Sequence, residues 1–99
     1  MDTAGLKAAT LIVKEDVSEL NFPKDNVLID VEEQKKLKSK INKALKLGNA
    51  LKGKVKIIFE DDEGRKMVET TIWGVTDKNI LLKKTTIVPI RRIHDIKFY

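Results

Sequence analysis

The side chains with the greatest potential for chemistry are two adjacent arginines in the closing stretch, "NILLKKTTIVPIRRIHDIKFY". The planar guanidinium groups of Arg91 and Arg92 can each donate paired hydrogen bonds to a phosphate or a carboxylate. The lysines at 83 and 84 are close enough in sequence to extend such a site. Intramolecular pairing with the acidic residues 60–63, or plain solvation, is the alternative that we expect.

A second basic region lies in the middle of the chain, where residues 35–59 hold nine lysines and no acidic residue. Acidic clusters stand on both sides of it, so the charge is unevenly distributed although the net charge is only +5. On the predicted helix, four lysines lie roughly opposite the apolar stripe: Lys35, Lys36, Lys43 and Lys46. Such a row can neutralise several phosphates, but we favour a lysine-rich, solvated helix face.

Three further features could serve recognition or metal binding. Trp73, the only tryptophan, could stack on a base or anchor a partner if exposed, but we expect the helix or the N-terminal segment to cover it. The acidic run 60–63 lacks the spaced oxygen ligands of a calcium loop and is typical of a hairpin tip. The sole histidine, His94, has no cysteine or second histidine beside it, so we expect a structural role.

The sequence carries no motif of an enzyme or a cofactor site. It contains no cysteine, which excludes disulfides, thiolate chemistry and cysteine-based zinc sites. It has no glycine-rich phosphate loop and no HExxH motif. We therefore predict no catalytic residue, no cofactor, no metal and no small-molecule substrate. The apolar runs are too short to span a bilayer and the start lacks the basic residues of a signal peptide, so we expect a cytoplasmic protein.

One helix and a set of strands have to position these residues. Asp30 is a suitable N-cap and forms a capping-box-like pair with Glu33. Gly48 and Asn49 supply the left-handed residue that ends many helices. Between these ends an apolar stripe recurs at helical spacing: Leu37, Ile41, Ala44 and Leu45. The pattern predicts one amphipathic helix with an apolar face and a lysine face.

Residues 53–99 predict a run of short antiparallel strands. Alternation in "KVKIIFE" places three apolar side chains on one face: Val55, Ile57 and Phe59. The turn at 61–65 can use Gly64 for a positive φ, and a second tight turn is expected near Thr85. Pro89 belongs at the end or edge of a strand because it has no N–H to donate.

The segment 89–93 predicts one tight helical turn before the last strand. In this turn Ile90 and Ile93 point inward, whereas Arg91 and Arg92 face outward. Five short strands with such a corner can curl into a small barrel.

The 99 residues suffice for one compact domain. We predict that residues 30–99 form it and that residues 1–29 form an N-terminal arm or extension. The run Thr10 to Val13 could be a short strand in this arm. The arm is expected to pack on the rest of the domain or on another copy of the protein.

The predicted fold class is α+β, with one amphipathic helix packed on a five-stranded, strongly curved antiparallel sheet or small barrel. A helix, then strands, then "VPIRRIHDIKF" resembles the Sm-like and Src-homology-3-like barrels over Glu32 to Phe98, and most of all the Rho-binding antitermination proteins. "KVKIIFEDDEG" also resembles a group of small bacterial proteins without a known role. The resemblance implies that binding RNA or a protein partner, often as a ring, is available to the fold.

We predict a small non-enzymatic binding module that engages a protein partner or itself. The clustered opposite charges and the arm favour this function. The alternative is nucleic-acid binding through the lysine face, the arginine pair and Trp73. A role for the basic helix at an anionic membrane surface is weaker, because its apolar stripe contains no aromatic anchor.

Overall fold

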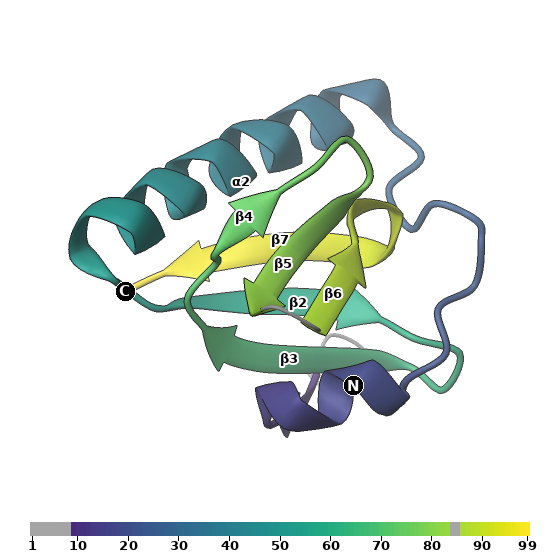
Figure 1. Cartoon of the computed structure of the whole chain (residues 1–99). Helices are drawn as coiled ribbons and strands as arrows, with labels where there is room; N and C mark the ends of the chain where they lie inside the picture. Colours follow the sequence, from purple (N-terminus) through teal and green to yellow (C-terminus); the bar gives the residue numbers. More distant parts are fainter. Residues whose placement is uncertain (1–8, 84–85) are drawn as a thin grey trace.

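The structure, a computed structural model, describes residues 9–83 and 86–99. Its elements follow in this order: β1 (Thr10–Ile12), the 3₁₀-helix η1 (Lys14–Glu19), α2 (Val31–Leu51), β2 (Val55–Glu60), β3 (Arg65–Thr70), β4 (Gly74–Val75), β5 (Asn79–Lys83), β6 (Thr86–Pro89), the 3₁₀-turn η2 (Ile90–Arg92) and β7 (Ile93–Phe98). The fold is therefore α+β (Figure 1). The predicted turn near Thr85 and the predicted contribution of Lys84 lie outside the described residues, as does the first part of the predicted arm.

The strands form two sheets of four and three strands, in place of the single five-stranded curved sheet or small barrel that we predicted. Sheet A has the order β1-β3-β2-β7 and sheet B the order β4-β5-β6. The chain leaves sheet A after Thr70, begins sheet B at Gly74, and returns to sheet A through η2. The one-turn corner at 90–92 is thus confirmed, but it joins two sheets rather than closing one. β1 adds a parallel strand beside β3, and this pairing could not be predicted from the turns between consecutive strands.

The helix begins as predicted and ends later. The side chain of Asp30 accepts a hydrogen bond from the Glu32 N–H at 2.8 Å, which confirms the N-cap. The helix continues through Gly48 to Leu51, and Lys52 takes the left-handed conformation with φ 54°. A Cβ on Gly48 would lie 2.6 Å from the Ile72 carbonyl oxygen. Gly48 therefore permits a close helix–strand approach instead of ending the helix.

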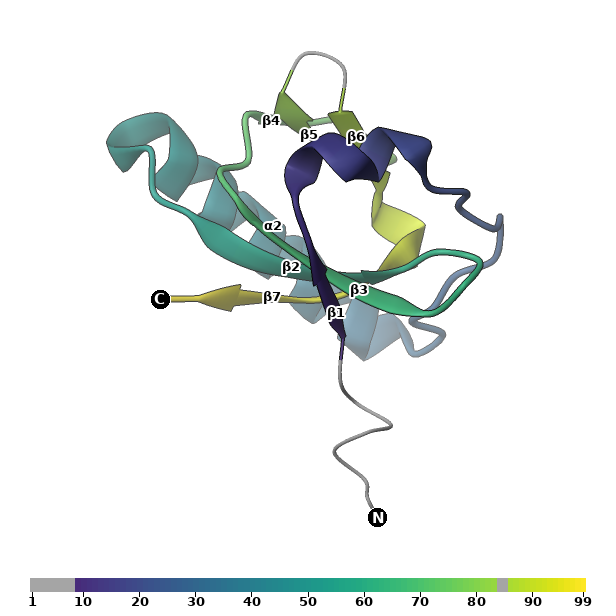
Figure 2. The same ribbon diagram turned by 90° about the horizontal axis from the view of Figure 1, so that it is seen from below.

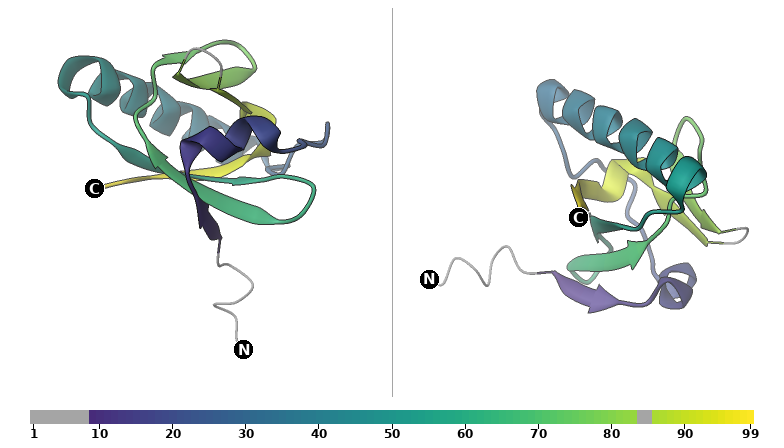
Figure 3. Two further views of the ribbon diagram at one scale, coloured as in Figure 1. Left: turned by 60° about the horizontal axis from the view of Figure 1, so that its bottom comes forward. Right: turned by 90° about the vertical axis from the view of Figure 1, so that its left-hand side faces the viewer.

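The core lies between the two sheets, and α2 and η1 close it from two sides (Figures 2 and 3). The predicted alternation of β2 is confirmed, with Val55, Ile57 and Phe59 fully buried. The helix contributes most of its predicted apolar stripe: Leu37, Ile41 and Ala44. Val17 of η1 is fully buried as well. Residues 9–29 therefore pack on the rest of the domain, one of the two alternatives left open for the arm.

Within the part of the chain that the structure describes, no helix has the length and apolar character needed to cross a membrane. Helix α2 carries exposed lysines along most of its length, and its apolar side packs against the core.

Candidate interaction surface

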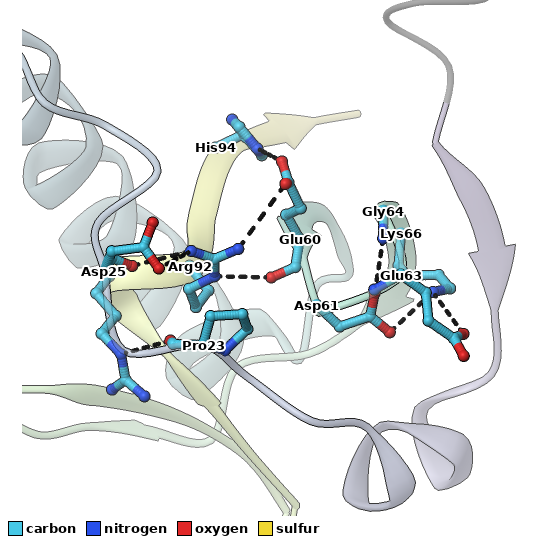
Figure 4. A network of polar contacts seen from close by, with 10 residues as sticks. Pro23, Asp25, Glu60, Asp61, Glu63, Gly64, Lys66, Arg92 and His94 are labelled. Carbon is cyan, nitrogen blue, oxygen red and sulfur yellow. Dashed lines mark hydrogen bonds and ion pairs between the residues drawn. The ribbon is translucent and has the colours of Figure 1, made fainter.

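Arg92 is a buried structural residue, and the prediction that it faces outward is wrong. Its side chain is 4% exposed. Its Nε donates to the Glu60 carbonyl oxygen at 3.0 Å, and its Nη1 donates to the Asp25 carbonyl at 2.9 Å and carboxylate at 3.3 Å. Its Nη2 lies 3.8 Å from a Glu60 carboxylate oxygen, and His94 contacts the same carboxylate at 2.8 Å (Figure 4). We call Asp25, Glu60, Arg92 and His94 the Arg92 socket; burial and these contacts hold the guanidinium inside the fold.

Arg91 points the other way and is only partly engaged. Its Nε donates to the Pro23 carbonyl oxygen at 3.0 Å, and its own carbonyl accepts from the Val27 N–H at 2.9 Å. Its two terminal guanidinium nitrogens make no hydrogen bond to any described residue, and the side chain lines a hollow. The predicted pairing of the arginines with the acidic run therefore holds for Arg92 and Glu60 alone.

The remaining predicted site residues are exposed but dispersed. Lys35, Lys36, Lys43 and Lys46 are exposed along α2, and the Lys43 ammonium lies 5.0 Å from the centre of the Phe98 ring. Trp73 is 57% exposed, so the expectation that it is covered is wrong. Its backbone N–H donates to the Leu81 carbonyl at 2.8 Å, which fixes the β3–β4 connection on sheet B and leaves the indole outside.

The acidic turn has the structural role predicted for it. Asp61 is 3% exposed and accepts from Lys66 Nζ at 2.8 Å and from the N–H groups of Glu63 and Gly64 at 2.9 and 3.1 Å. Burial raises the pKa of Asp61, but the hydrogen bonds and the charge of Lys66 outweigh it and hold the pKa below its ordinary value. Gly64 takes φ 140° at the tip. Among the described residues, no three acidic or histidine side chains are grouped to hold a metal ion.

The outer face of sheet A presents an apolar row that the sequence did not reveal. The strand register aligns Leu11 of β1, Met67 of β3 and Ile58 of β2 on the side away from the core. Leu11 is 59% exposed, and Ile58 and Met67 are half-buried. Tyr99 follows on the same face, 73% exposed, with the Lys56 ammonium 5.3 Å from its ring centre. Solvent-facing apolar rows of this kind are typical of interaction sites.

Charged side chains flank the apolar row in an alternating pattern. On one side Lys56 of β2 is paired in register with Glu69 of β3, and on the other Glu60 of β2 is paired with Arg65 of β3. Each strand thus carries one cation and one anion, placed two residues before and after its central apolar residue. No ion pair among the described residues involves Lys56, Glu69 or Arg65. Their charges are available to a partner.

Helix α2 borders this face on its β7 side. Lys36 and Lys40 of the helix line a hollow of about 350 Å³ together with Ile58, Arg65 and Lys97 of the sheet. Lys40 is held there by an ion pair with Asp95 of β7 at 2.6 Å. The surface is consequently open above β1, β3 and β2, and α2 borders it along β7. We call this surface, with its apolar row and flanking charges, the sheet A face.

No protein-family model, no curated protein and no solved structure matches this chain. What the molecule does has to be inferred from its own surfaces. Three of these stand out: the sheet A face, the exposed Trp73 beside sheet B, and the hollow that Arg91 lines. Of the seven predicted site residues, none lies in the apolar row, because a parallel β1–β3 pairing is needed to complete that row.

Proposed function

We propose that this chain is a small non-enzymatic binding module that pairs with a second copy of itself through the sheet A face. One observation supports this function above the others: on β2 and β3, the charges around the apolar row would face opposite charges in a second, two-fold-related copy. Identical surfaces that meet about a two-fold axis must satisfy this condition, since each residue faces the same set of residues in the other copy.

The complementarity follows from the register of β2 and β3. When two such faces meet about an axis parallel to the strands, β2 of one copy lies over β3 of the other. Lys56 then faces Glu69 of the second copy, Glu60 faces Arg65, and Ile58 faces Met67. The charged residues of β2 and β3 each meet their opposite and Ile58 meets Met67, whereas β7, with Asp95 and Lys97 on the same face, comes over β1 of the other copy.

The helix selects between the two possible axes. Because α2 borders only the β7 side, an axis parallel to the strands places the two helices on opposite sides of the interface. Each helix then lies next to the exposed β1 edge of the other copy, where Leu11 is uncovered. An axis across the strands would bring both helices to the same side, where they would hold the faces apart.

Different groups supply affinity and geometry in this arrangement. Exposed ion pairs contribute about 0.2–1 kcal/mol each, so the two pairs between Lys56 and Glu69 fix orientation more than they add affinity. Glu60 adds less toward Arg65, because Arg92 and His94 already engage its carboxylate. The burial of Leu11, Ile58, Met67 and Tyr99 contributes roughly 25 cal/mol per Å² of apolar surface removed from water.

Sedimentation equilibrium over a wide range of protein concentration tests this function. We expect a reversible monomer–dimer equilibrium that Glu69→Lys weakens about tenfold, because two Lys–Lys contacts replace two ion pairs in the dimer. The double variant Lys56→Glu/Glu69→Lys restores opposite charges across the axis and should recover dimerisation. Glu69 is the better choice than Glu60, whose carboxylate is already engaged by Arg92 and His94.

The matched control is Glu19→Lys, which makes the same charge change at an exposed residue of η1 outside the sheet A face. A protein that stays monomeric at every concentration contradicts the proposal. So does equal weakening by Glu69→Lys and Glu19→Lys, because net charge alone would then account for the effect.

A further inference from the structure

A cationic cleft opens on the opposite side of Arg91 from the Arg92 socket. It has a volume of about 660 Å³, and four of its lining side chains are cations: Lys24, Lys38, Lys78 and Arg91. They come from four separate parts of the chain, namely the segment before α2, the helix itself, the β4–β5 turn and η2. In Figure 1 these parts meet beside the N-terminal half of α2. Sequence analysis selected only Arg91 of the four.

Backbone hydrogen bonds join these parts and hold the cleft in shape. The Val27 N–H donates to the Arg91 carbonyl at 2.9 Å, and the Ile90 N–H donates to the Lys78 carbonyl at 2.8 Å. The side chain of Gln34 on α2 donates to the Leu28 carbonyl at 2.7 Å. A site built in this way loses little conformational entropy when a ligand enters, so more of the contact energy appears as affinity.

The charge in the cleft is unbalanced. Asp77 is the only carboxylate among its lining residues, and none of the four cations forms an ion pair with a described residue. Lys40 and Lys66 in contrast form close ion pairs, whereas the exposed lysines of α2 outside the cleft, such as Lys43 and Lys46, are spread along the helix. Four convergent cations with one carboxylate repel one another, and an anion would relieve that repulsion.

The lining is apolar as well as cationic. Leu28, Leu37 and Ile90 form part of it; Leu37 belongs to the core, and Leu28 and Ile90 are half-buried and pack against the core. The volume falls within the range of about 300–1,000 Å³ that is typical of small-molecule sites. It leaves room for an organic body beside the anionic group.

We infer that this cleft is a binding site for a small organic phosphate, a phosphate ester whose apolar or planar body lies on Leu28, Leu37 and Ile90. The free terminal nitrogens of Arg91 can bind two phosphate oxygens at once. Lys24, Lys38 and Lys78 can neutralise the second negative charge, which a carboxylate ligand would lack. This site shares no residue with the sheet A face, so either can fail without the other.

Titration of ¹⁵N-labelled full-length protein tests the site. Phenyl phosphate and adenosine monophosphate are the ligands, phenol and adenosine are the uncharged controls, and a single-stranded oligonucleotide reports the other source of phosphate. We expect saturable one-to-one binding of the two phosphate esters, with amide shifts confined to the four lining parts. The uncharged controls should not bind.

Lys38→Gln removes a cleft cation from an exposed helix position and should weaken the binding of phosphate esters at least about tenfold. Lys46→Gln, the same change on the same helix outside the cleft, should alter it less than about twofold. Absence of saturable binding by either ester overturns the inference, as do equal effects of the two substitutions. Binding of the oligonucleotide alone also overturns it, since the cations would then serve a nucleic-acid surface.

Discussion

The Arg92 socket and the cationic cleft lie on the two sides of η2. Of two neighbouring arginines in η2, Arg92 belongs to the socket and Arg91 lines the cleft. Arg92 is 4% exposed, donates to two backbone carbonyls and is paired with Asp25 and Glu60. Arg91 uses only its Nε, on the Pro23 carbonyl. The two side chains are chemically identical and adjacent, yet Arg92 is buried among Asp25 and Glu60, whereas neither terminal nitrogen of Arg91 bonds to a described residue.

The difference teaches where recognition by a basic chain should be sought. A charge that is buried pays for its desolvation with local partners, and those partners remove it from any role in binding. A charged side chain that lines a hollow without a partner can still form its ion pair or hydrogen bonds with a ligand. Counting lysines and arginines along the sequence cannot separate the two cases.

The largest expected effect is on the socket. Arg92→Met keeps the length of the side chain but leaves the Glu60 and Asp25 carbonyls without their donor and the Glu60 carboxylate with His94 alone. We expect the free energy of unfolding to fall by roughly 3 kcal/mol, measured by urea denaturation. A fall of less than about 1 kcal/mol would contradict the structural role. The variant should still bind phosphate esters under conditions where it is folded.

A buried carboxylate extends the comparison to acidic residues. Asp61→Asn keeps the shape but loses the ion pair with Lys66, and we expect a loss of roughly 2 kcal/mol at neutral pH. Because the pKa of Asp61 is lowered on folding, its contribution is fully present above the ordinary value of 3.8 and is lost as the pH falls through the folded pKa.

Urea denaturation at several pH values measures this difference. The gap in stability between the native protein and Asp61→Asn should narrow below pH 3.8. The exposed neighbour Asp62, changed to Asn, is the matched control and should show no such gap. A constant gap down to low pH would show that the titration of Asp61 contributes nothing.

For Arg91, the corresponding arginine of the cleft, substitution should lower ligand binding more than it lowers stability. Arg91→Met loses one hydrogen bond to the Pro23 carbonyl, so we expect a fall of about 1 kcal/mol in the free energy of unfolding. Binding of phenyl phosphate should weaken at least about tenfold, measured by calorimetry. If Arg91→Met and Arg92→Met destabilise the protein equally, the two arginines do not differ in the way described.

The smallest expected effect concerns the one carboxylate of the cleft. Asp77→Asn should change stability by less than about 0.5 kcal/mol, as is usual for a surface position. It should tighten phosphate binding about two- to threefold, since one repulsive charge is removed. Glu19→Gln, an equal change far from the cleft, should leave the binding constant unchanged. Weaker binding by Asp77→Asn would mean that its carboxylate orients a cation.

The local features of the fold were predictable because they depend on short-range rules. The N-cap at Asp30, the alternation of β2, the hairpin tip at Gly64 and the turn at 90–92 each follow from residues within one turn or one strand. The end of the helix was not predictable from such rules, because Gly48 packs against the carbonyl of Ile72, which is far away in sequence.

The same limit applies to both proposed sites. The sheet A face depends on a parallel pairing of β1 with β3, and a three-residue strand carries no signal of the partner that it selects. The cleft combines four separate parts of the chain, and of its four cations only Arg91 was a candidate from the sequence. Their side-chain chemistry could be read from the sequence, but their convergence is a property of the tertiary fold.

Residues 20–29 contain no helix or strand, and hydrogen bonds to η2 hold them in place. The bond between Arg92 and the Asp25 carbonyl spans 67 positions of the chain. In an unfolded chain, closing a loop of that length costs roughly 4 kcal/mol of entropy. Pairing of β2 with β7 already brings Arg92 to Glu60 and covers much of that cost. The native position of the segment before the helix therefore depends on the pairing of β2 with β7, and so does the cleft that this segment borders.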